Sequence, residues 1–115
     1  LSAVRSLGRA GLEVVLVAAG SDPAIGYSRH VSRTEVLPEV SDRVVFTRLL
    51  DIAPSSDRPF LLATGDHDAL IVSNHQLQLR EKYRFVCPSH DVLLSMVNKA
   101  RLYEFARDRG YSLPD

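Results

Sequence analysis

Asn98 and Lys99 stand next to each other in a region that otherwise follows a helical pattern. Asparagine is unfavourable inside a helix but a good N-cap, so the pair predicts one helix ending before Asn98 and another beginning there. The restart would leave free backbone N–H groups beside the Lys99 ammonium, a combination that suits a phosphate. A lysine at helical spacing is also commonly a solvated surface charge, and spacing alone does not decide between the two interpretations.

Two other places carry side chains suited to ligand binding. Arg29, beside Ser28 and His30, offers a planar fork of donors that matches a carboxylate or a phosphate, although a loop arginine is often simply solvated. Asp66 can accept a hydrogen bond from a ligand, or it can cap the helix expected after it. Ligands of parallel sheets gather at the carboxyl ends of the strands. Three segments are predicted to lie there: residues 20–30, 64–68 and 88–91.

The remaining reactive residue types show no spacing typical of a site. The four histidines have no metal-ligand spacing, and the single cysteine, Cys87, has no partner for a Cys-x-x-Cys motif or an internal disulfide. Cys87 ends an apolar segment, which favours burial over a role as a nucleophile. Gly8 and Gly11 form Gly-x-x-Gly at the end of a helix, whereas a dinucleotide-binding motif opens a helix after a strand. The sequence therefore predicts no catalytic or metal-ligating residue.

The composition is that of one soluble globular domain. The 115 residues leave room for a modest core. Fourteen basic and fourteen acidic residues give a net charge of zero, which disfavours binding to nucleic acid or to an anionic membrane. The longest strongly apolar run, residues 14–19, is far shorter than the ~20 residues of a membrane helix. A lone cysteine and the absence of a signal-peptide pattern favour a cytoplasmic location.

Strands and amphipathic helices alternate along the chain. Apolar runs bounded by Gly, Pro and Ser predict strands at residues 13–19, 34–37, 59–64 and 83–87. Helical spacing predicts helices over residues 1–10, 41–53, 66–79 and 89–109. The third of these helices starts near Asp66 or Asp68, and its polar middle permits a break.

This order predicts an α/β fold: an open, mostly parallel, Rossmann-like sheet with helices on both faces. Such a sheet normally begins with a strand, whereas this chain begins at Leu1 in a helical pattern, so we expect the first strand to be missing and the chain to be part of a longer protein. Without a central strand the sheet would expose two edges, which predicts marginal stability or a homodimer. We expect an α/β domain over residues 1–88 and a helical segment over residues 89–115.

Several short motifs of the chain occur together, in the same order, in one known superfamily. They are RSLGRAG (5–11) leading into VVLV (14–17), YSRH (27–30), LLATGD (61–66), and NK (98–99) followed by Leu102, Tyr103, Ala106, Gly110 and LP (113–114). Together they resemble the N-terminal, pre-ATP-grasp domain of ATP-grasp ligases such as carbamoyl-phosphate synthase, and most closely the carboxylate-amine ligase branch. The resemblance covers almost the whole chain, and its most specific motifs are RSLGRAG and NK.

The resemblance implies that the parent protein is an ATP- and Mg²⁺-dependent ligase, which activates a carboxylate as an acyl phosphate for attack by an amine. It implies that Lys99 reaches the nucleotide phosphates and that Ser28, Arg29 and Asp66 face the substrate cleft. Most of the adenine pocket and the metal-binding carboxylates would lie in an ATP-grasp region after Asp115. The implied partners are that region and small carboxylate and amine substrates, and the chain alone is expected to be inactive.

Two alternatives stay open from the sequence. One is a non-catalytic α/β binding or assembly module that kept the fold without the chemistry. The other is a receiver-like signalling domain with Asp66 as phosphoacceptor, but such a domain has a lysine where this chain has Cys87, directly before Pro88. An ATP-grasp continuation after Asp115 would favour the ligase, and a stop codon there would favour the module.

Overall fold

The computed structural model describes residues 2–19 and 27–112. The chain forms two compact units, Leu1–Val45 and Phe46–Asp115. The boundary falls inside helix α2 (Asp42–Ile52), so α2 begins in the first unit and ends in the second.

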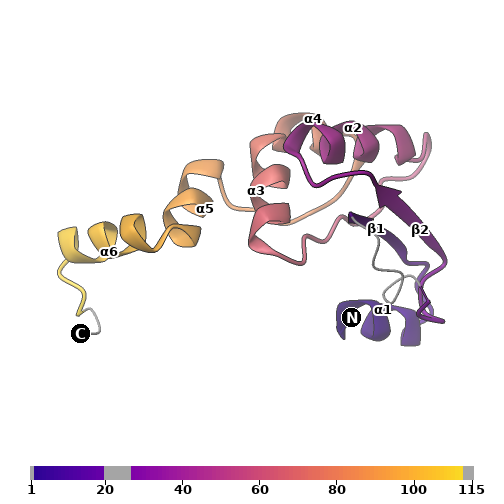
Figure 1. The fold of residues 1–115 in the computed structure, drawn as a ribbon, viewed down its shortest axis with the longest axis horizontal. Helices are drawn as coiled ribbons and strands as arrows, with labels where there is room; N and C mark the ends of the chain where they lie inside the picture. The colour runs from indigo at the N-terminus through magenta and orange to yellow at the C-terminus, as the bar shows by residue number, and fades with distance from the viewer. Residues whose placement is uncertain (1, 20–26, 113–115) are drawn as a thin grey trace. The chain divides into compact units, whose positions relative to one another are not determined.

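The first unit contains a pair of parallel strands. β1 (Val15–Ala19) and β2 (Arg33–Leu37) pair with Val15 opposite Arg33 and Ala19 opposite Leu37, and Figure 1 shows them side by side. The valines of β1 favour an extended backbone because β-branched side chains pack well on a pleated surface. Val4, Val14 and Leu37 are the buried apolar residues of this unit.

Helix α1 (Ser2–Arg9) is followed by a glycine turn, as the sequence predicted. Gly11 has a φ of 77°, in the left-handed region that glycine adopts without strain. Its N–H donates to Gly8 O at 3.1 Å, and the Leu12 N–H donates to Leu7 O at 3.2 Å. These two bonds satisfy carbonyls at the end of the helix and turn the chain toward β1.

The second unit is mainly helical. It contains α3 (Asp66–Asn74), α4 (Gln76–Lys82), α5 (His90–Val97) and α6 (Lys99–Asp108). His75 separates α3 from α4, at the break that the polar sequence permitted, and its ring stacks on Phe46 with centroids 3.9 Å apart. The buried apolar residues of this unit are Leu49, Ile71, Val72, Leu79, Tyr83 and Phe85.

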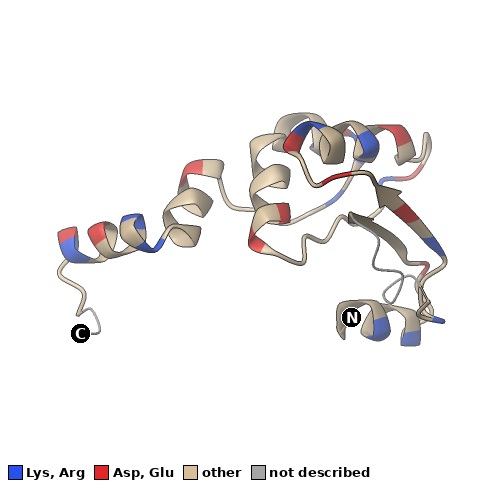
Figure 2. Ribbon diagram, viewed as in Figure 1, with Lys and Arg blue, Asp and Glu red and all other residues tan. Residues whose placement is uncertain are grey.

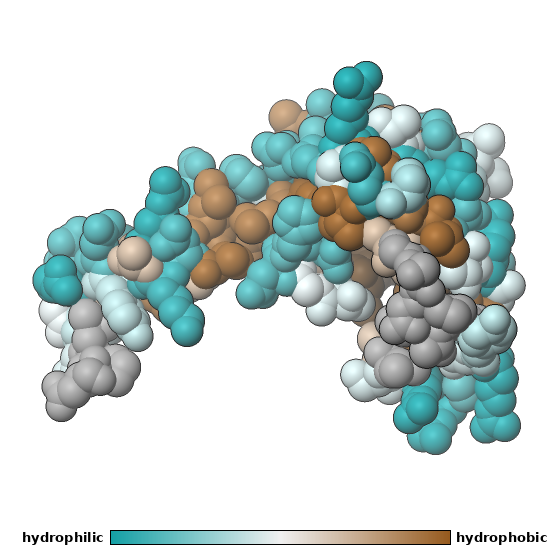
Figure 3. All heavy atoms as spheres, viewed as in Figure 1, coloured by the Kyte–Doolittle hydropathy of each residue, from teal (hydrophilic) through white to brown (hydrophobic). Residues whose placement is uncertain are grey.

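A buried polar contact ties α5 to α3. The Ser73 hydroxyl donates to Leu70 O at 2.8 Å and lies 2.8 Å from His90 Nδ1. A serine hydroxyl carries one proton, so with that proton on Leu70 O the His90 Nδ1–H donates to Ser73 Oγ. Apolar side chains on α5 such as Val92 and Met96 stay exposed, and Figure 3 shows hydrophobic side chains gathered over this helix.

Two predicted strands do not form. Residues 59–64 and 83–87 meet only at one parallel bridge, Phe60 opposite Arg84. Parallel strands normally have both faces covered, but three apolar side chains here are largely exposed: Phe60 at 64%, Leu62 at 50% and Val86 at 92%. The described part of the fold is therefore mixed α/β with a two-stranded parallel sheet. The boundary expected between residues 88 and 89 stays a prediction.

Tyr83 connects three parts of the second unit. Its side chain is only 5% exposed, and its hydroxyl donates to Leu49 O of α2 at 2.6 Å. Its backbone N–H donates to Leu79 O at the end of α4. Its carbonyl accepts from Arg58 Nη2 at 3.1 Å, and the same nitrogen donates to Arg80 O. Tyr83 therefore fixes α4 and the segment after it against α2.

Replacing Tyr83 with phenylalanine should lower the free energy of unfolding by about 1–2 kcal/mol, because Leu49 O loses its buried donor. Urea denaturation followed by circular dichroism measures the loss. Tyr103→Phe, at an exposed tyrosine of α6, is the matched control and should change stability by less than about 0.5 kcal/mol. Equal stabilities for Tyr83→Phe and the wild type would contradict the role given to this hydrogen bond.

Candidate functional site

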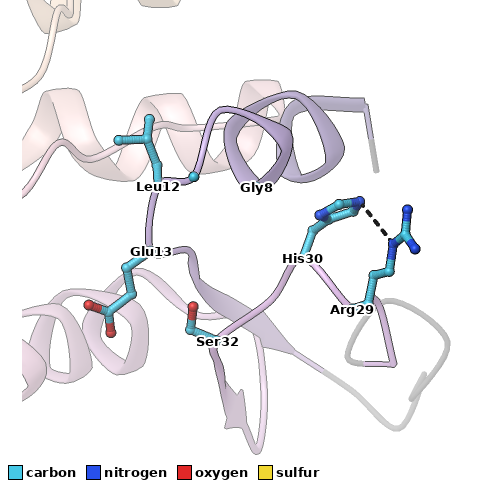
Figure 4. A pocket seen from close by; sticks show the side chains of 7 residues that line it. Gly8, Leu12, Glu13, Arg29, His30 and Ser32 are labelled. Atoms are coloured by element: carbon cyan, nitrogen blue, oxygen red, sulfur yellow. Dashed lines mark hydrogen bonds between the residues drawn. The ribbon is translucent and has the colours of Figure 1, made fainter.

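The first unit contains an open pocket of about 350 Å³ between the end of α1 and the residues that precede the two strands (Figure 4). Two glycines and several polar side chains form most of its wall. The lining residues are Gly8, Gly11, Leu12, Glu13, Arg29, His30 and Ser32. Of the predicted site residues, only Arg29 lines this pocket.

The pocket depends on a close approach of Gly8 to His30. A Cβ on Gly8 would lie 2.5 Å from His30 Cβ, a separation that two carbon atoms do not tolerate. The absence of a side chain at Gly8 therefore lets the segment before β2 pack against α1. This contact joins two motifs that are far apart in the sequence, residues 5–11 and 27–30.

Short hydrogen-bonded turns hold Ser28, Arg29 and His30 together. Ser28 O accepts from Val31 N–H at 2.9 Å, and Ser28 Oγ lies 3.4 Å from the His30 N–H that donates to it. The Arg29 Nε–H donates to His30 Nε2 at 3.4 Å, which is the dashed line in Figure 4. Because Nε2 accepts this bond, the His30 imidazole carries its proton on Nδ1.

Ser28 and Arg29 lie at the opposite edge of the strand pair from the one expected. Ser32 N–H donates to Val14 O at 2.8 Å, and Val14 N–H donates to Ser32 Oγ at 3.3 Å, just before the first paired residues of the two strands. The expected position at the carboxyl ends was wrong. The crossover between parallel strands must return to the amino edge, and residues 28–30 come at its end. Residues 20–26 of the same predicted segment lie outside the described residues.

Asp66 is the first residue of α3 and is exposed. Gly65 occupies the N-cap position, so the alternative in which Asp66 caps the helix is wrong. Asp68, also in the first turn, accepts a long 3.5 Å hydrogen bond from Thr64 Oγ1. Acidic side chains at this end of a helix interact favourably with its dipole.

The helix break at Asn98 is confirmed. Asn98 separates α5 from α6, and its Oδ1 accepts from the N–H groups of Ala100 and Arg101 at 3.0 and 3.3 Å. Lys99 is the first residue of α6, and its side chain is exposed. The expectation of free backbone amides was therefore wrong for Ala100 and Arg101, because their N–H groups donate to the Asn98 side chain. Lys99 remains as a cation at a helix N-terminus.

The predicted residues thus belong to different units and elements. Ser28 and Arg29 belong to the first unit, whereas Asp66 and Lys99 begin two different helices of the second. Sequence reasoning missed the participation of Glu13 and Ser32, which come together with Arg29 only through the register of β1 and β2. The predicted first strand, residues 13–19, included Glu13, whereas β1 begins at Val15, so the available signal was only the nearness of both residues to a strand start.

Charges of both signs lie on α2, α4 and α6, whereas the charged residues of α1 are two arginines and those of α3 and α5 are aspartates (Figure 2). Within residues 2–19 and 27–112, no group of three His, Cys, Asp or Glu side chains is placed to hold a metal ion. No helix in the described part of the chain has the length and apolar character needed to cross a membrane.

Cys87 is half-buried, less than the sequence suggested. Burial raises the pKa of its thiol, and the positive charge of Arg80 opposes this effect without cancelling it. A raised pKa means a smaller fraction of thiolate at neutral pH, so the thiol is a poor nucleophile. The guanidinium of Arg80 also lies over the Phe85 ring, 4.9 Å from its centroid.

Arg80→Gln should raise the pKa of Cys87 further, because only the opposing charge is removed. The rate of alkylation by iodoacetamide should then fall at mildly alkaline pH, and its pH profile should move to higher pH. Arg84→Gln, at an exposed arginine close in sequence, is the control and should leave the profile in place. A faster reaction in Arg80→Gln would show that the charge does not act as described, provided that circular dichroism shows the variant folded.

Gly8→Ala should destabilise the protein by about 1–3 kcal/mol, because the new Cβ overlaps His30 Cβ. Helix propensity alone predicts the opposite sign, a gain of about 1 kcal/mol. Urea denaturation therefore separates the two effects by sign. Ser6→Ala, at an exposed position of the same helix, is the control and should be neutral or slightly stabilising. A Gly8→Ala variant more stable than the wild type would exclude the close contact.

Comparison of the chain with protein-family models, with curated proteins and with solved structures found no match. The resemblance to ATP-grasp ligases therefore rests on the short motifs of the sequence, and the function that it implies is a proposal.

Proposed function

We propose that this chain is the front domain of an ATP-dependent ligase that joins a carboxylate to an amine through an acyl phosphate. The observation that carries the proposal is the start of α6, where Lys99 directly follows the Asn98 cap with its side chain exposed. The asparagine and the lysine also form the NK motif, one of the two most specific motifs of the resemblance.

The supported role of Lys99 is that of a cation for a nucleotide phosphate. Because two amides of the first turn already donate to Asn98 Oδ1, the helix terminus has fewer free N–H groups to donate to a phosphate. The ammonium is the group suited to balance negative charge on a transferred phosphoryl group. Bound ATP and Mg²⁺ would supply the phosphoryl group and its bridging metal, and the magnesium ligands are proposed to lie in the ATP-grasp region.

The arrangement of elements is compatible with this architecture. The β1–β2 pair and the Phe60–Arg84 bridge are both parallel. Parallel segments need a crossover connection, and the one between Phe60 and Arg84 contains α3 and α4. We propose that in the complete protein these segments belong to one open, mostly parallel sheet with helices on both faces. Asp66 follows the bridged segment at its carboxyl end, where a substrate would bind, and stays the substrate-side residue of this proposal.

Ser28 and Arg29 fit the proposed substrate cleft less well. They lie before β2, at the amino edge of the strand pair, whereas ligands of such sheets bind at the other edge. Their assignment to the substrate rests on the resemblance alone. The domain as proposed supplies a substrate-side wall and one cation, and the chain by itself is not an enzyme.

Lys99→Ala should raise the KM for ATP at least about tenfold in the ligase formed by this chain and its continuation, because a charge that neutralises the phosphates is lost. Lys99→Arg keeps the charge and should retain part of the affinity. The rate of phosphate release, measured against ATP concentration with amino acids as substrates, gives the KM for ATP of each variant.

The control is Lys82→Ala, at the other lysine of the chain, exposed at the end of α4. It should leave the KM for ATP within about twofold of the wild type. An unchanged nucleotide dependence in Lys99→Ala would refute the role of Lys99. A reading frame that stops at Asp115, with no nucleotide-binding partner, would refute the ligase itself and favour a non-catalytic module.

A further inference from the structure

We infer that Arg29 and His30 form a subsite for a carboxylate at the amino edge of the β1–β2 pair, with His30 as the positioning residue. The subsite lies in the first unit, at the amino edge of the strand pair and not at the carboxyl edge, whereas Lys99 begins a helix of the second unit. It requires no nucleotide, so it can be present or absent independently of the proposed function.

His30 is held in place by its neighbours. A Cβ on Gly8 would come within 2.5 Å of His30 Cβ and 2.8 Å of its Nδ1, so the His30 side chain lies directly against Gly8, and the His30 N–H donates to Ser28 Oγ. The imidazole is therefore packed against the end of α1 before any ligand binds. A fixed acceptor can restrict a flexible partner, and the partner here is Arg29, whose Nε–H donates to His30 Nε2.

This bond leaves the two terminal nitrogens of Arg29 for a ligand. An arginine bonded through Nε presents two parallel N–H groups on its Nη atoms, and that spacing matches the two oxygens of a carboxylate. Restricting the side chain in advance lowers the entropy lost on binding, because fewer rotamers must be given up. Arg29 is exposed and lines the pocket, so a ligand has access to it.

The other side chains of the pocket favour a singly charged carboxylate over a phosphate dianion. Glu13 lines the same pocket, and its negative charge repels a phosphate dianion about twice as strongly as a singly charged carboxylate at the same distance. Ser32 Oγ accepts from Val14 N–H, so its hydroxyl proton is directed away from that bond and can be donated to an oxygen in the pocket. A small carboxylic acid meets these conditions better than inorganic phosphate does.

The experiment is a titration of the ¹⁵N-labelled 115-residue chain with acetate and, separately, with inorganic phosphate, at mildly alkaline pH where imidazole side chains are neutral. Chemical shifts of the Arg29 Nε–H group and of the residue 28–32 amides report binding. We expect saturable shifts with acetate, and affinity for acetate that exceeds that for phosphate. Arg29→Lys should abolish the saturable shifts, because the fork of donors is lost.

His30→Ala should weaken acetate binding about fivefold by releasing Arg29, whereas His30→Gln, whose Oε1 can accept from Nε–H, should stay within about twofold of the wild type. Glu13→Gln should reduce the difference between the affinity for acetate and the affinity for phosphate, because the negative charge that disfavours phosphate is removed. Arg43→Lys, at an exposed arginine of α2 outside the pocket, should change nothing.

Absence of saturable shifts near Arg29 in the wild type would overturn the subsite. Equal affinities of His30→Ala and the wild type would overturn the positioning role, and phosphate binding as tight as acetate binding would overturn the carboxylate preference. Thermal denaturation of His30→Ala checks that it folds, and His30→Gln keeps the test decisive if it does not. Lys99→Ala should bind acetate with wild-type affinity, because Lys99 is not part of the subsite. The acetate titration therefore tests the subsite alone, and the KM for ATP tests the ligase proposal alone.

Discussion

The hydrogen bond from the Tyr83 hydroxyl to Leu49 O is the interaction on which the second unit depends most. It closes a loop of more than thirty residues, and it does so in a core where a lone carbonyl would be costly. The Tyr83 N–H also donates to Leu79 O at the end of α4, and the Tyr83 carbonyl accepts a hydrogen bond from the Arg58 guanidinium. Apolar contacts of Leu79 and Ile71 provide burial without direction, whereas this residue determines how α2, α4 and the bridged segments are oriented.

The first unit follows a different constraint, the direction of its two strands. Because β1 and β2 are parallel, the residues before both strands meet at one edge, and this brings Glu13, Ser32 and Arg29 into one pocket although they come from distant parts of the sequence. Gly8 then allows His30 to approach the helix that precedes β1. The pocket is thus a product of topology and of one missing side chain.

Local signals in the sequence predicted local structure well. Gly11 acts through its left-handed backbone and Asn98 through its capping side chain, so the end of α1 and the break before α6 could be predicted directly from residue type. Strands depend on neighbours far away in the chain, and an apolar run such as residues 59–64 looks the same whether or not its partners cover it. Sequence reasoning therefore overestimated the sheet.

The candidate residues show the same division. The ligand-binding chemistry of Arg29 was predicted from its side chain, but the predicted edge was wrong, because residue 29 lies nearer to the start of β2 than to the end of β1. Asp66 was taken as a possible cap one residue too late, since Gly65 has that position. The join between α5 and α6 carries a mechanical consequence, because Asn98 is the only non-helical residue between them. A joint of one residue leaves two soft backbone dihedral angles, φ and ψ of Asn98, to set the direction of α6 from the end of α5, and with it the side on which the lysine lies.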